Sequence, residues 1–186
     1  DLKSGHKTGL YLDQRKNGPV IAKYCRGEVL NCFAYTGAFA LAVLAAGDST
    51  VENVESSRQA LELLAENVRL NGFDEKRAPV REGDVFQVLR EYREAGRLFD
   101  AVILDPPKFA VSRGKIEGAM RGYKDINLLA LSLLKAGGIL ATFSCSGLVT
   151  PEQFRMAAAY AAMDAGREVQ VLERLGQAPD HPAALH

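Results

Sequence analysis

The sequence predicts an α/β fold in which helices cover a doubly wound, mostly parallel sheet. Short apolar segments alternate along the 186 residues with helical segments, as expected for strand–helix–strand units. One apolar run, FDAVILD at residues 99–105, shows no polar alternation, which is typical of a strand buried on both faces of a parallel sheet. The length and the 47% hydrophobic content suffice for one domain with a substantial core.

The first half of the chain supplies three strand–helix pairs. The clearest helix is expected where apolar side chains such as Leu61 and Leu64 recur at helical spacing before Gly72. The second strand is the weakest, because Glu52 and Asn53 interrupt it. The expected strands cover residues 28–33, 49–55 and 78–82, and the expected helices cover residues 37–47, 57–71 and 85–96.

The second half continues the alternation after the strand at 99–105. The helix at 150–166 has complete end signals: Thr150 as N-cap, Pro151 at the first helical position and Gln153 closing a capping box. The other expected elements are a loop over residues 106–122, a helix over about 123–135, and strands over 137–143 and 167–175.

Composition narrows the class of protein. Lys plus Arg and Asp plus Glu both total 23, so the net charge is zero and any RNA affinity must come from a local patch or another domain. The 3 cysteines are far apart, which argues against a disulfide framework or a zinc site. Free thiols and the lack of a signal peptide or membrane-length apolar run predict a cytoplasmic protein. The start, DLKSGHKTG, reads as a mid-protein segment, so residues 1–186 are expected to be one domain of a longer chain.

In such sheets, ligands bind beyond the carboxyl ends of the strands. The turn NCFAYTG at residues 31–37 leads from a strand into a helix and suits a nucleotide, although a plain connection is an alternative and the three-glycine dinucleotide fingerprint is absent. Glu55 can accept hydrogen bonds from both hydroxyls of a ribose. Asp84 can bind an adenine amino group or cap the next helix, with Val85 and Phe86 as apolar ring contacts.

Two later strand ends carry the reactive groups. In DPPKF, two prolines fix the backbone after a buried strand and aim Asp105 at one place. Cys145 lies past an apolar run in the polar loop SCSG. It is either a small buried hydrophobe or a nucleophile held at the edge of the sheet, and the polar loop favours the nucleophile. Cys25 and Cys32 lack such a setting and are expected to be structural.

The order of these features resembles the class I S-adenosylmethionine-dependent methyltransferases, which have a Rossmann-like fold. Within them the chain is similar to the bacterial 23S ribosomal RNA (cytosine-C5)-methyltransferases. Members of that family also carry an RNA-binding PUA domain and a β linker domain, neither of which is expected within residues 1–186. They also carry a final antiparallel strand, which the sheet is expected to lack. The matching motifs are GHKTGLYLDQR, VLNCFAYTGAFA, FDAVILDPPKF, RGYKDINLLA, FSCSG and QAPDHP.

The resemblance implies S-adenosylmethionine as cofactor and S-adenosylhomocysteine as product. Asn31 stands where the family usually has Asp, and Glu52 and Asn53 stand where apolar residues are more usual. The residues implied to hold the cofactor are Gln14, Arg15, Asn31, Phe33, Tyr35, Thr36, Gly37, Glu55, Ser56, Asp84, Val85 and Asp105.

The implied activity is methyl transfer to carbon 5 of a cytosine in large-subunit ribosomal RNA, with Cys145 as covalent nucleophile and Asp105 holding the base. Many RNA cytosine-5 methyltransferases carry a second cysteine after the two prolines, where this chain has Lys108. The resemblance implies 23S rRNA as partner, no metal and no membrane, and it allows a homodimer of the full-length protein. The expected substrate-binding residues are Pro106, Lys108, Phe109, Tyr123 and Lys124, in a loop 113–124 that also carries Arg113, Lys115 and Arg121.

Two alternative functions stay open at this point. A related branch methylates guanine in ribosomal RNA and would not need the thiol. A domain without its RNA-binding partner could also bind the cofactor, or RNA, without turnover. A dinucleotide-dependent oxidoreductase is disfavoured by the incomplete glycine fingerprint.

Overall fold

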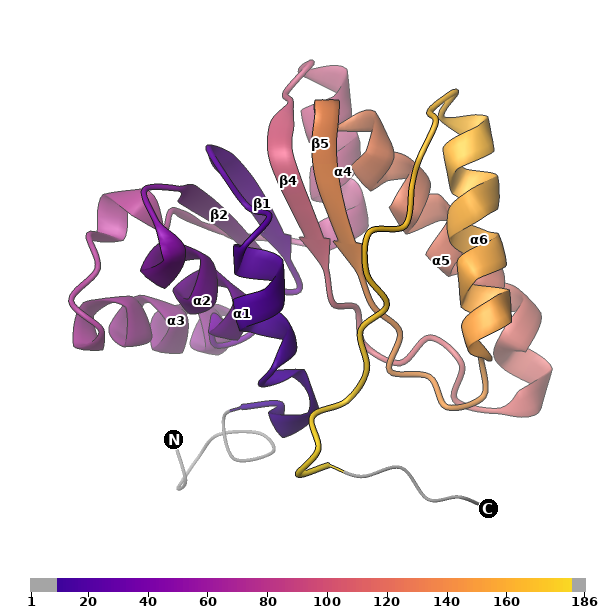
Figure 1. The fold of residues 1–186 in the computed structure, drawn as a ribbon, viewed down its shortest axis with the longest axis horizontal. Coiled ribbons are helices and arrows are strands. Elements are labelled where there is room, and N and C mark those ends of the chain that lie inside the picture. Colours follow the sequence, from indigo (N-terminus) through magenta and orange to yellow (C-terminus); the bar gives the residue numbers. More distant parts are fainter. Residues whose placement is uncertain (1–9, 182–186) are drawn as a thin grey trace.

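A computed structural model describes residues 10–181, which form a five-stranded parallel sheet with helices on both faces (Figure 1). The strand order is β3-β2-β1-β4-β5. The order reverses between β1 and β4, which places the topological switch point of the sheet at the carboxyl ends of these two strands. The strands are β1 Glu28–Cys32, β2 Thr50–Glu55, β3 Val80–Glu82, β4 Phe99–Leu104 and β5 Leu134–Thr142.

Alternate residues of the strands pack into two hydrophobic clusters, one on each face of the sheet. Leu30 and Cys32 of β1 pack on the face covered by α4, α5 and α6, whereas Val29 packs on the face covered by α1, α2 and α3. All three side chains are buried, as expected for a central parallel strand. The helices are α1 Asn17–Ala22, α2 Ala38–Ala46, α3 Arg58–Leu70, α4 Val85–Glu94, α5 Ile116–Ser132 and α6 Pro151–Asp164, and short 3-10 helices cover Leu12–Gln14, Glu75–Arg77 and Arg113–Lys115.

Helix ends follow the local signals in the sequence. Ser57 accepts a hydrogen bond from the backbone N–H of Ala60, and Asp84 caps α4 in the same way. The predicted capping box of α6 is confirmed, because Thr150 and Gln153 each accept a hydrogen bond from the other residue's backbone N–H. Within residues 10–181, none of the helices combines the length and the apolar character needed to cross a membrane.

The expected loop over residues 106–122 is wrong in its second half, because α5 begins at Ile116. Ala119, Tyr123 and Ile126 are buried at helical spacing, so tertiary packing overrides the poor helix propensity of Gly118 and Gly122. The short helix α1 at 17–22 is not predicted by the sequence analysis.

The expected last strand over residues 167–175 is also wrong. This segment leaves α6 and runs past β5 without joining the sheet (Figure 1). Val169, Val171 and Leu172 are exposed. Their alternating pattern predicts a half-buried strand, but a strand forms only where a neighbour supplies hydrogen bonds, and β5 is paired with β4 alone among the described residues.

The chain leaves β1 through a turn with left-handed backbone at alternate residues. Phe33 has φ 58°, Tyr35 has φ 47° and Gly37 has φ 89°. A Cβ atom added at Gly37 would lie 2.7 Å from Cγ of Leu64, a fully buried residue of α3. Only glycine therefore allows this turn and α3 to approach so closely.

We expect Gly37→Ala to destabilise the fold more than Gly72→Ala. Gly72 also has a left-handed φ of 72°, but its added Cβ meets nothing within 4 Å. Both variants carry the strain of a left-handed alanine, about 1–2 kcal/mol. Gly37→Ala adds the overlap with Leu64, about 1–3 kcal/mol more. Urea denaturation measures both, and equal losses would show that α3 yields without cost.

Candidate functional site

Four strands deliver their predicted site residues to one edge of the sheet. Cys32, the last residue of β1, pairs with Val54 of β2 and with Leu104 of β4. Leu104 in turn pairs with Thr142 of β5. The residues after these pairs are the turn 33–37, Glu55, Asp105 and the loop with Cys145. The parallel register therefore brings together segments that the sequence analysis selected separately.

Glu55 joins the turn after β1 to the start of α3. Its Oε2 accepts a hydrogen bond from the backbone N–H of Tyr35 at 3.0 Å. Its Oε1 accepts from the backbone N–H groups of Ser56 and Ser57 at 2.8 and 3.0 Å, and from the Ser56 hydroxyl at 3.1 Å. A carboxylate offers about four acceptor positions. Glu55 is therefore held in place by backbone donors and retains acceptor capacity on Oε2.

Asn31 and Asn53 are buried polar residues on neighbouring strands, and they form a hydrogen bond with each other. Nδ2 of Asn31 donates to Oδ1 of Asn53 at 2.9 Å, and Nδ2 of Asn53 donates to the carbonyl of Val51 at 2.8 Å. Asn31 is 1% exposed, and its Oδ1 has no hydrogen-bond partner among residues 10–181. An unpaired buried acceptor is costly. Its position, one residue before the end of β1, suits a ligand that brings a hydrogen-bond donor.

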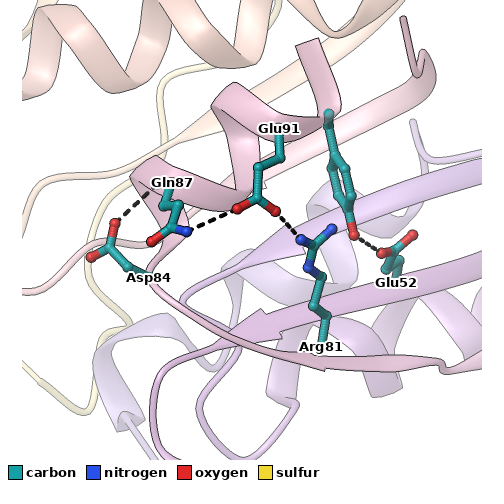
Figure 2. Close-up of polar contacts among 6 residues, drawn as sticks. Glu52, Arg81, Asp84, Gln87 and Glu91 are labelled. Atoms are coloured by element: carbon teal, nitrogen blue, oxygen red, sulfur yellow. Dashed lines mark hydrogen bonds and ion pairs between the residues drawn. The ribbon is translucent and has the colours of Figure 1, made fainter. Parts of the chain in front are cut away.

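Asp84 is supported by a chain of polar contacts along α4, which Figure 2 shows. Asp84 accepts a hydrogen bond from the backbone N–H of Gln87 at 3.0 Å. The Gln87 amide donates to Glu91 at 2.9 Å, and Glu91 forms an ion pair with Arg81 of β3. The prediction that Asp84 caps the next helix is confirmed. Val85, which was expected to contact the cofactor, instead buries its side chain in the core.

The same polar chain continues to Glu52, the unusual acidic residue of β2 (Figure 2). The Tyr92 hydroxyl donates to Glu52, and Arg97 pairs with the other carboxylate oxygen at 2.8 Å. Both guanidinium groups, of Arg81 and Arg97, lie over the Tyr92 ring at 4.6 and 4.5 Å. Burial and the contact with Glu52 raise the pKa of Tyr92. These contacts compensate the charge of Glu52 and tie β2, β3 and α4 together.

Asp105 is a partly buried carboxyl group at the end of β4. Gln14 donates a hydrogen bond to its Oδ1 at 3.0 Å, and Asn17 donates to Gln14 at 2.6 Å. Burial raises the pKa of Asp105 to about 6, with a smaller contribution from the charge of Asp13, and the hydrogen bond from Gln14 opposes this shift. The LDQR segment thus contacts the site through Gln14. The GHKTG part of its motif lies outside the described residues.

Cys145 is exposed beside the DPPKF loop, so it is not a small hydrophobic residue of the core. Its Sγ lies 3.6 Å from the carbonyl oxygen of Pro106, to which the thiol donates. Ser144 donates to the hydroxyl of Tyr123 at 2.8 Å, and the Ser146 hydroxyl accepts from the backbone N–H of Ala110 at 3.1 Å. Both flanking serines therefore fix the loop that carries the thiol.

The other two cysteines are buried in the core, as expected for structural residues. Burial raises the pKa of Cys25 to about 11 and raises the pKa of Cys32 even further. Neither thiol is available as a nucleophile at neutral pH. No cluster of residues able to hold a metal ion occurs in the described part of the chain.

Two expected substrate contacts are not placed as predicted. Tyr123 is fully buried, and its ring lies between Phe109 and Phe154 at centroid distances of 4.7 and 5.1 Å. It cannot stack on an RNA base in this structure, and it orients Ser144 instead. Lys124 points to α6 and pairs with Asp164 at 2.7 Å.

The segment 177–180 contacts the LDQR segment, residues 12–15, through a backbone hydrogen bond and an ion pair. The backbone N–H of Ala178, which is buried, donates to the carbonyl of Asp13 at 2.9 Å. Asp180 forms an ion pair with Arg15 at 3.0 Å. This pair engages the guanidinium of Arg15, which the resemblance places among the residues that hold the cofactor, and it joins the QAPD segment to the LDQR segment.

Tyr11 is a site residue that the sequence analysis did not select. Its ring packs edge-on against Tyr35 at 5.3 Å. Burial raises the pKa of Tyr11, and the nearby groups of Cys145, Asp105 and Glu55 contribute to the increase. Tyr11 therefore lies among the three groups singled out from the sequence, and only its position next to the LDQR motif could have indicated this.

Comparisons with known proteins show the family to which the chain belongs. A sequence model of the family described as S-adenosylmethionine-dependent methyltransferase matches residues 1–185. The chain is 55% identical over 185 residues to ribosomal RNA large subunit methyltransferase I of Tolumonas auensis, covering 99% of this chain and 47% of that protein. It is 51% identical to the protein of the same name from Shewanella denitrificans, covering 98% and 46%. The chain thus spans about half the length of these relatives.

Among solved structures, SMU.776 complexed with SAH superimposes with a TM-score of 0.85 at 22% identity, covering 98% of this chain and 48% of that one. A SAM-dependent methyltransferase from Streptococcus mutans gives a TM-score of 0.75 at 24% identity, covering 86% and 42%. At these identities the likeness concerns the fold, and it confirms the predicted Rossmann-like architecture.

Replacing Asp105 by Asn should stabilise the fold in a pH-dependent way. The folded-state pKa of about 6 lies above the ordinary value of 3.8, so burying the carboxylate opposes folding once the group ionises. The gain of Asp105→Asn should be near zero below about pH 4, grow up to about pH 6, and then stay constant at up to about 3 kcal/mol. Urea denaturation across this pH range measures it.

Asp100→Asn is the matched control, because the pKa of Asp100 is lowered in the folded protein whereas that of Asp105 is raised. The backbone N–H of Glu28 and the ammonium of Lys135 lower the pKa of Asp100. This variant should therefore lose stability at neutral pH, and the loss should fade as the pH drops below about 4. Parallel pH profiles for the two variants would contradict the assignment for Asp105.

Proposed function

This chain belongs to the S-adenosylmethionine-dependent methyltransferase family, and we propose that it methylates carbon 5 of a cytosine in large-subunit ribosomal RNA through a covalent adduct with Cys145. The observation that carries the proposal is the exposed thiol of Cys145 at the carbonyl of Pro106, the residue after Asp105. The name ribosomal RNA large subunit methyltransferase I, borne by relatives that are 50–55% identical, supports the choice of RNA.

The residues at the sheet edge fit the cofactor. Glu55 would accept a hydrogen bond from a ribose hydroxyl on Oε2, and Asp84 would accept one from the adenine amino group on the oxygen not used for capping. The unpaired Oδ1 of Asn31 would accept from the ammonium group of the amino-acid part. When bound, the cofactor supplies a methyl group on a positively charged sulfonium.

Cys145 would start the reaction as a thiolate that attacks carbon 6 of the cytosine. The new carbon–sulfur bond converts the ring to an enamine, so that carbon 5 becomes nucleophilic and accepts the methyl group. Transfer of the carbon 5 proton to a base, such as a water molecule, then restores the double bond and expels the Cys145 thiolate. Because Cys25 and Cys32 are buried, this release uses no second thiol.

Asp105 would hold the Watson–Crick edge of the base. As Cys145 adds, negative charge develops at ring nitrogen 3, and a protonated Asp105 can donate to it while its second oxygen accepts from the amino group. A pKa of about 6 keeps the protonated form accessible at neutral pH. Pro106 contributes its backbone carbonyl rather than its ring, which is buried.

The target base must leave its stack to reach a thiol and a carboxyl group at the sheet edge. Single-stranded or opened RNA is therefore the expected substrate. A guanine target would leave the exposed Cys145, held by two flanking serines, without a role.

We expect Cys145→Ala to abolish methyl transfer and to leave cofactor binding unchanged. RNA containing 5-fluorocytosine should trap the parent as a covalent adduct on a denaturing gel, because fluorine at carbon 5 cannot leave as a proton does. The adduct should vanish in Cys145→Ala and persist in the control Cys25→Ala, whose thiol is buried. The full-length relative from Tolumonas auensis, assayed in parallel, shows whether the part of that protein outside the matched region is needed to capture RNA. An adduct that survives Cys145→Ala would refute the covalent mechanism.

We expect Glu55→Ala to weaken cofactor binding chiefly. Loss of one charge-assisted hydrogen bond at about 1.5–3 kcal/mol should raise the dissociation constant of S-adenosylhomocysteine by roughly 10-fold to 150-fold, measured by calorimetry. Glu66→Ala, on the exposed face of α3, is the control. An unchanged constant in Glu55→Ala would remove Glu55 from the cofactor site.

A further inference from the structure

A depression next to the DPPKF loop has no role in the mechanism above. It is a depression of about 430 Å³ between the start of α4, the loop after β4 and the first turns of α5. This volume falls in the range of about 300–1,000 Å³ typical of small-molecule sites. Its lining includes Phe86, Phe109, Lys108, Lys115, Gly118 and Gly122.

Two aromatic rings form an apolar wall of the depression. Phe86 and Phe109 are partly exposed, with centroids 6.1 Å apart and ring planes tilted by 38°. Phe109 is supported from behind by the fully buried ring of Tyr123 at 4.7 Å. The wall is therefore backed by the core, as a stacking surface for a planar ligand should be.

The side of the depression formed by α5 carries two glycines, whose lack of side chains leaves space for a ligand. A Cβ added at Gly118 meets nothing within 4 Å, and one added at Gly122 would lie 3.3 Å from the Phe109 ring. Glycine inside a helix costs about 1 kcal/mol relative to alanine, and here it leaves space in front of Phe109.

Two lysines supply positive charge at the depression. Lys108 and Lys115 are exposed, and neither forms an ion pair among residues 10–181. In contrast, the other basic residues of α5 are neutralised, since Arg121 pairs with Glu117 and Lys124 pairs with Asp164. Aromatic rings beside unneutralised cations suit a nucleotide, whose base stacks and whose phosphate is anionic.

The depression adjoins the catalytic group through one short loop. Lys108 follows Pro106 by two residues, and the Pro106 carbonyl lies 3.6 Å from the Cys145 thiol. The lining includes neither Glu55 nor Asp84, the groups expected to hold the ribose and the adenine amino group. Phe86 is the one lining residue that was also expected to contact the adenine ring. The depression is thus next to the target base and separate from Glu55 and Asp84.

We propose that this depression binds the base of a nucleotide that neighbours the target cytosine in the RNA, stacked on Phe109 and Phe86 with phosphate held by Lys108 and Lys115. This inference rests on RNA being the substrate, as proposed above. It adds a second base-binding position, so the chain should bind an unstacked strand of at least two nucleotides rather than a single base.

The test fills the depression without touching the thiol or the cofactor contacts. Gly118→Leu places a large side chain at the lining of the depression, whereas Gly118→Ala is the matched control that adds only a methyl group. Anisotropy of a fluorescent single-stranded RNA containing cytosine, with S-adenosylhomocysteine present, measures binding. We expect Gly118→Leu to weaken RNA binding about 10-fold or more, as stacking of a base implies, and Gly118→Ala to bind like the parent.

A second variant tests the charges independently of the helix. Lys108→Gln combined with Lys115→Gln should weaken RNA binding and reduce the slope of log affinity against log salt by about 1.4, since each phosphate contact on a single strand contributes about 0.7. Calorimetry with S-adenosylhomocysteine should give the same affinity in all variants, and thermal unfolding verifies that each is folded.

Several results would overturn the proposal. The first is unchanged RNA binding in folded Gly118→Leu, and the second is absence of RNA binding by the parent. The third is a loss of S-adenosylhomocysteine affinity in Gly118→Leu that parallels its loss of RNA affinity, which would assign the depression to the cofactor. Displacement of RNA by polyglutamate as effectively as by unlabelled RNA would show a surface for an acidic protein instead. Failure of the Cys145 adduct with RNA binding still sensitive to Gly118→Leu would refute only the thiol mechanism.

Discussion

The candidate site depends on the parallel pairing of β1 with both β2 and β4. In a parallel sheet all strands end at the same edge, and here the register places Val54 and Leu104 on either side of Cys32. Glu55 and Asp105 therefore emerge at the same level although they are far apart in the sequence. A shift of one residue in either pairing would turn the strand's side chains to the opposite faces and would separate these carboxyl groups.

This central pairing tolerates polar side chains only where they are compensated. Glu52 is bound by Tyr92 and Arg97, and Asn53 is hydrogen-bonded to Asn31 and to backbone carbonyls. The exception is Oδ1 of Asn31, which is buried without a partner in the described chain. That acceptor lies at the functional edge, which suggests that stability is lost where a ligand would restore the missing hydrogen bond.

Local signals explain what the sequence could predict. The sheet strands, α2 to α4 and the capping of α6 follow from periodicity and end residues, and Asp105 and Cys145 could be selected because they directly follow apolar runs. The start of α5 was missed because core packing outweighs two glycines, and the segment 167–175 was misassigned because strand formation depends on a distant neighbour. Tyr11 and Asp180 could not be predicted as site residues, because only the tertiary fold brings their partners close to them.

Tyr123 shows why a buried residue can matter to two parts of a site that it does not line. Its hydroxyl accepts a hydrogen bond from Ser144, which precedes the thiol, and its ring supports Phe109, which lines the aromatic depression. Both contacts come from one side chain on α5 that is fully enclosed by Phe109, Phe154 and the core. The thiol and the proposed stacking surface therefore share one rigid support, so a target base and its neighbour would be held in a fixed relation to each other. Tyr123, which the sequence predicts to contact RNA, would therefore affect RNA binding only through the positions that it gives to Ser144 and Phe109.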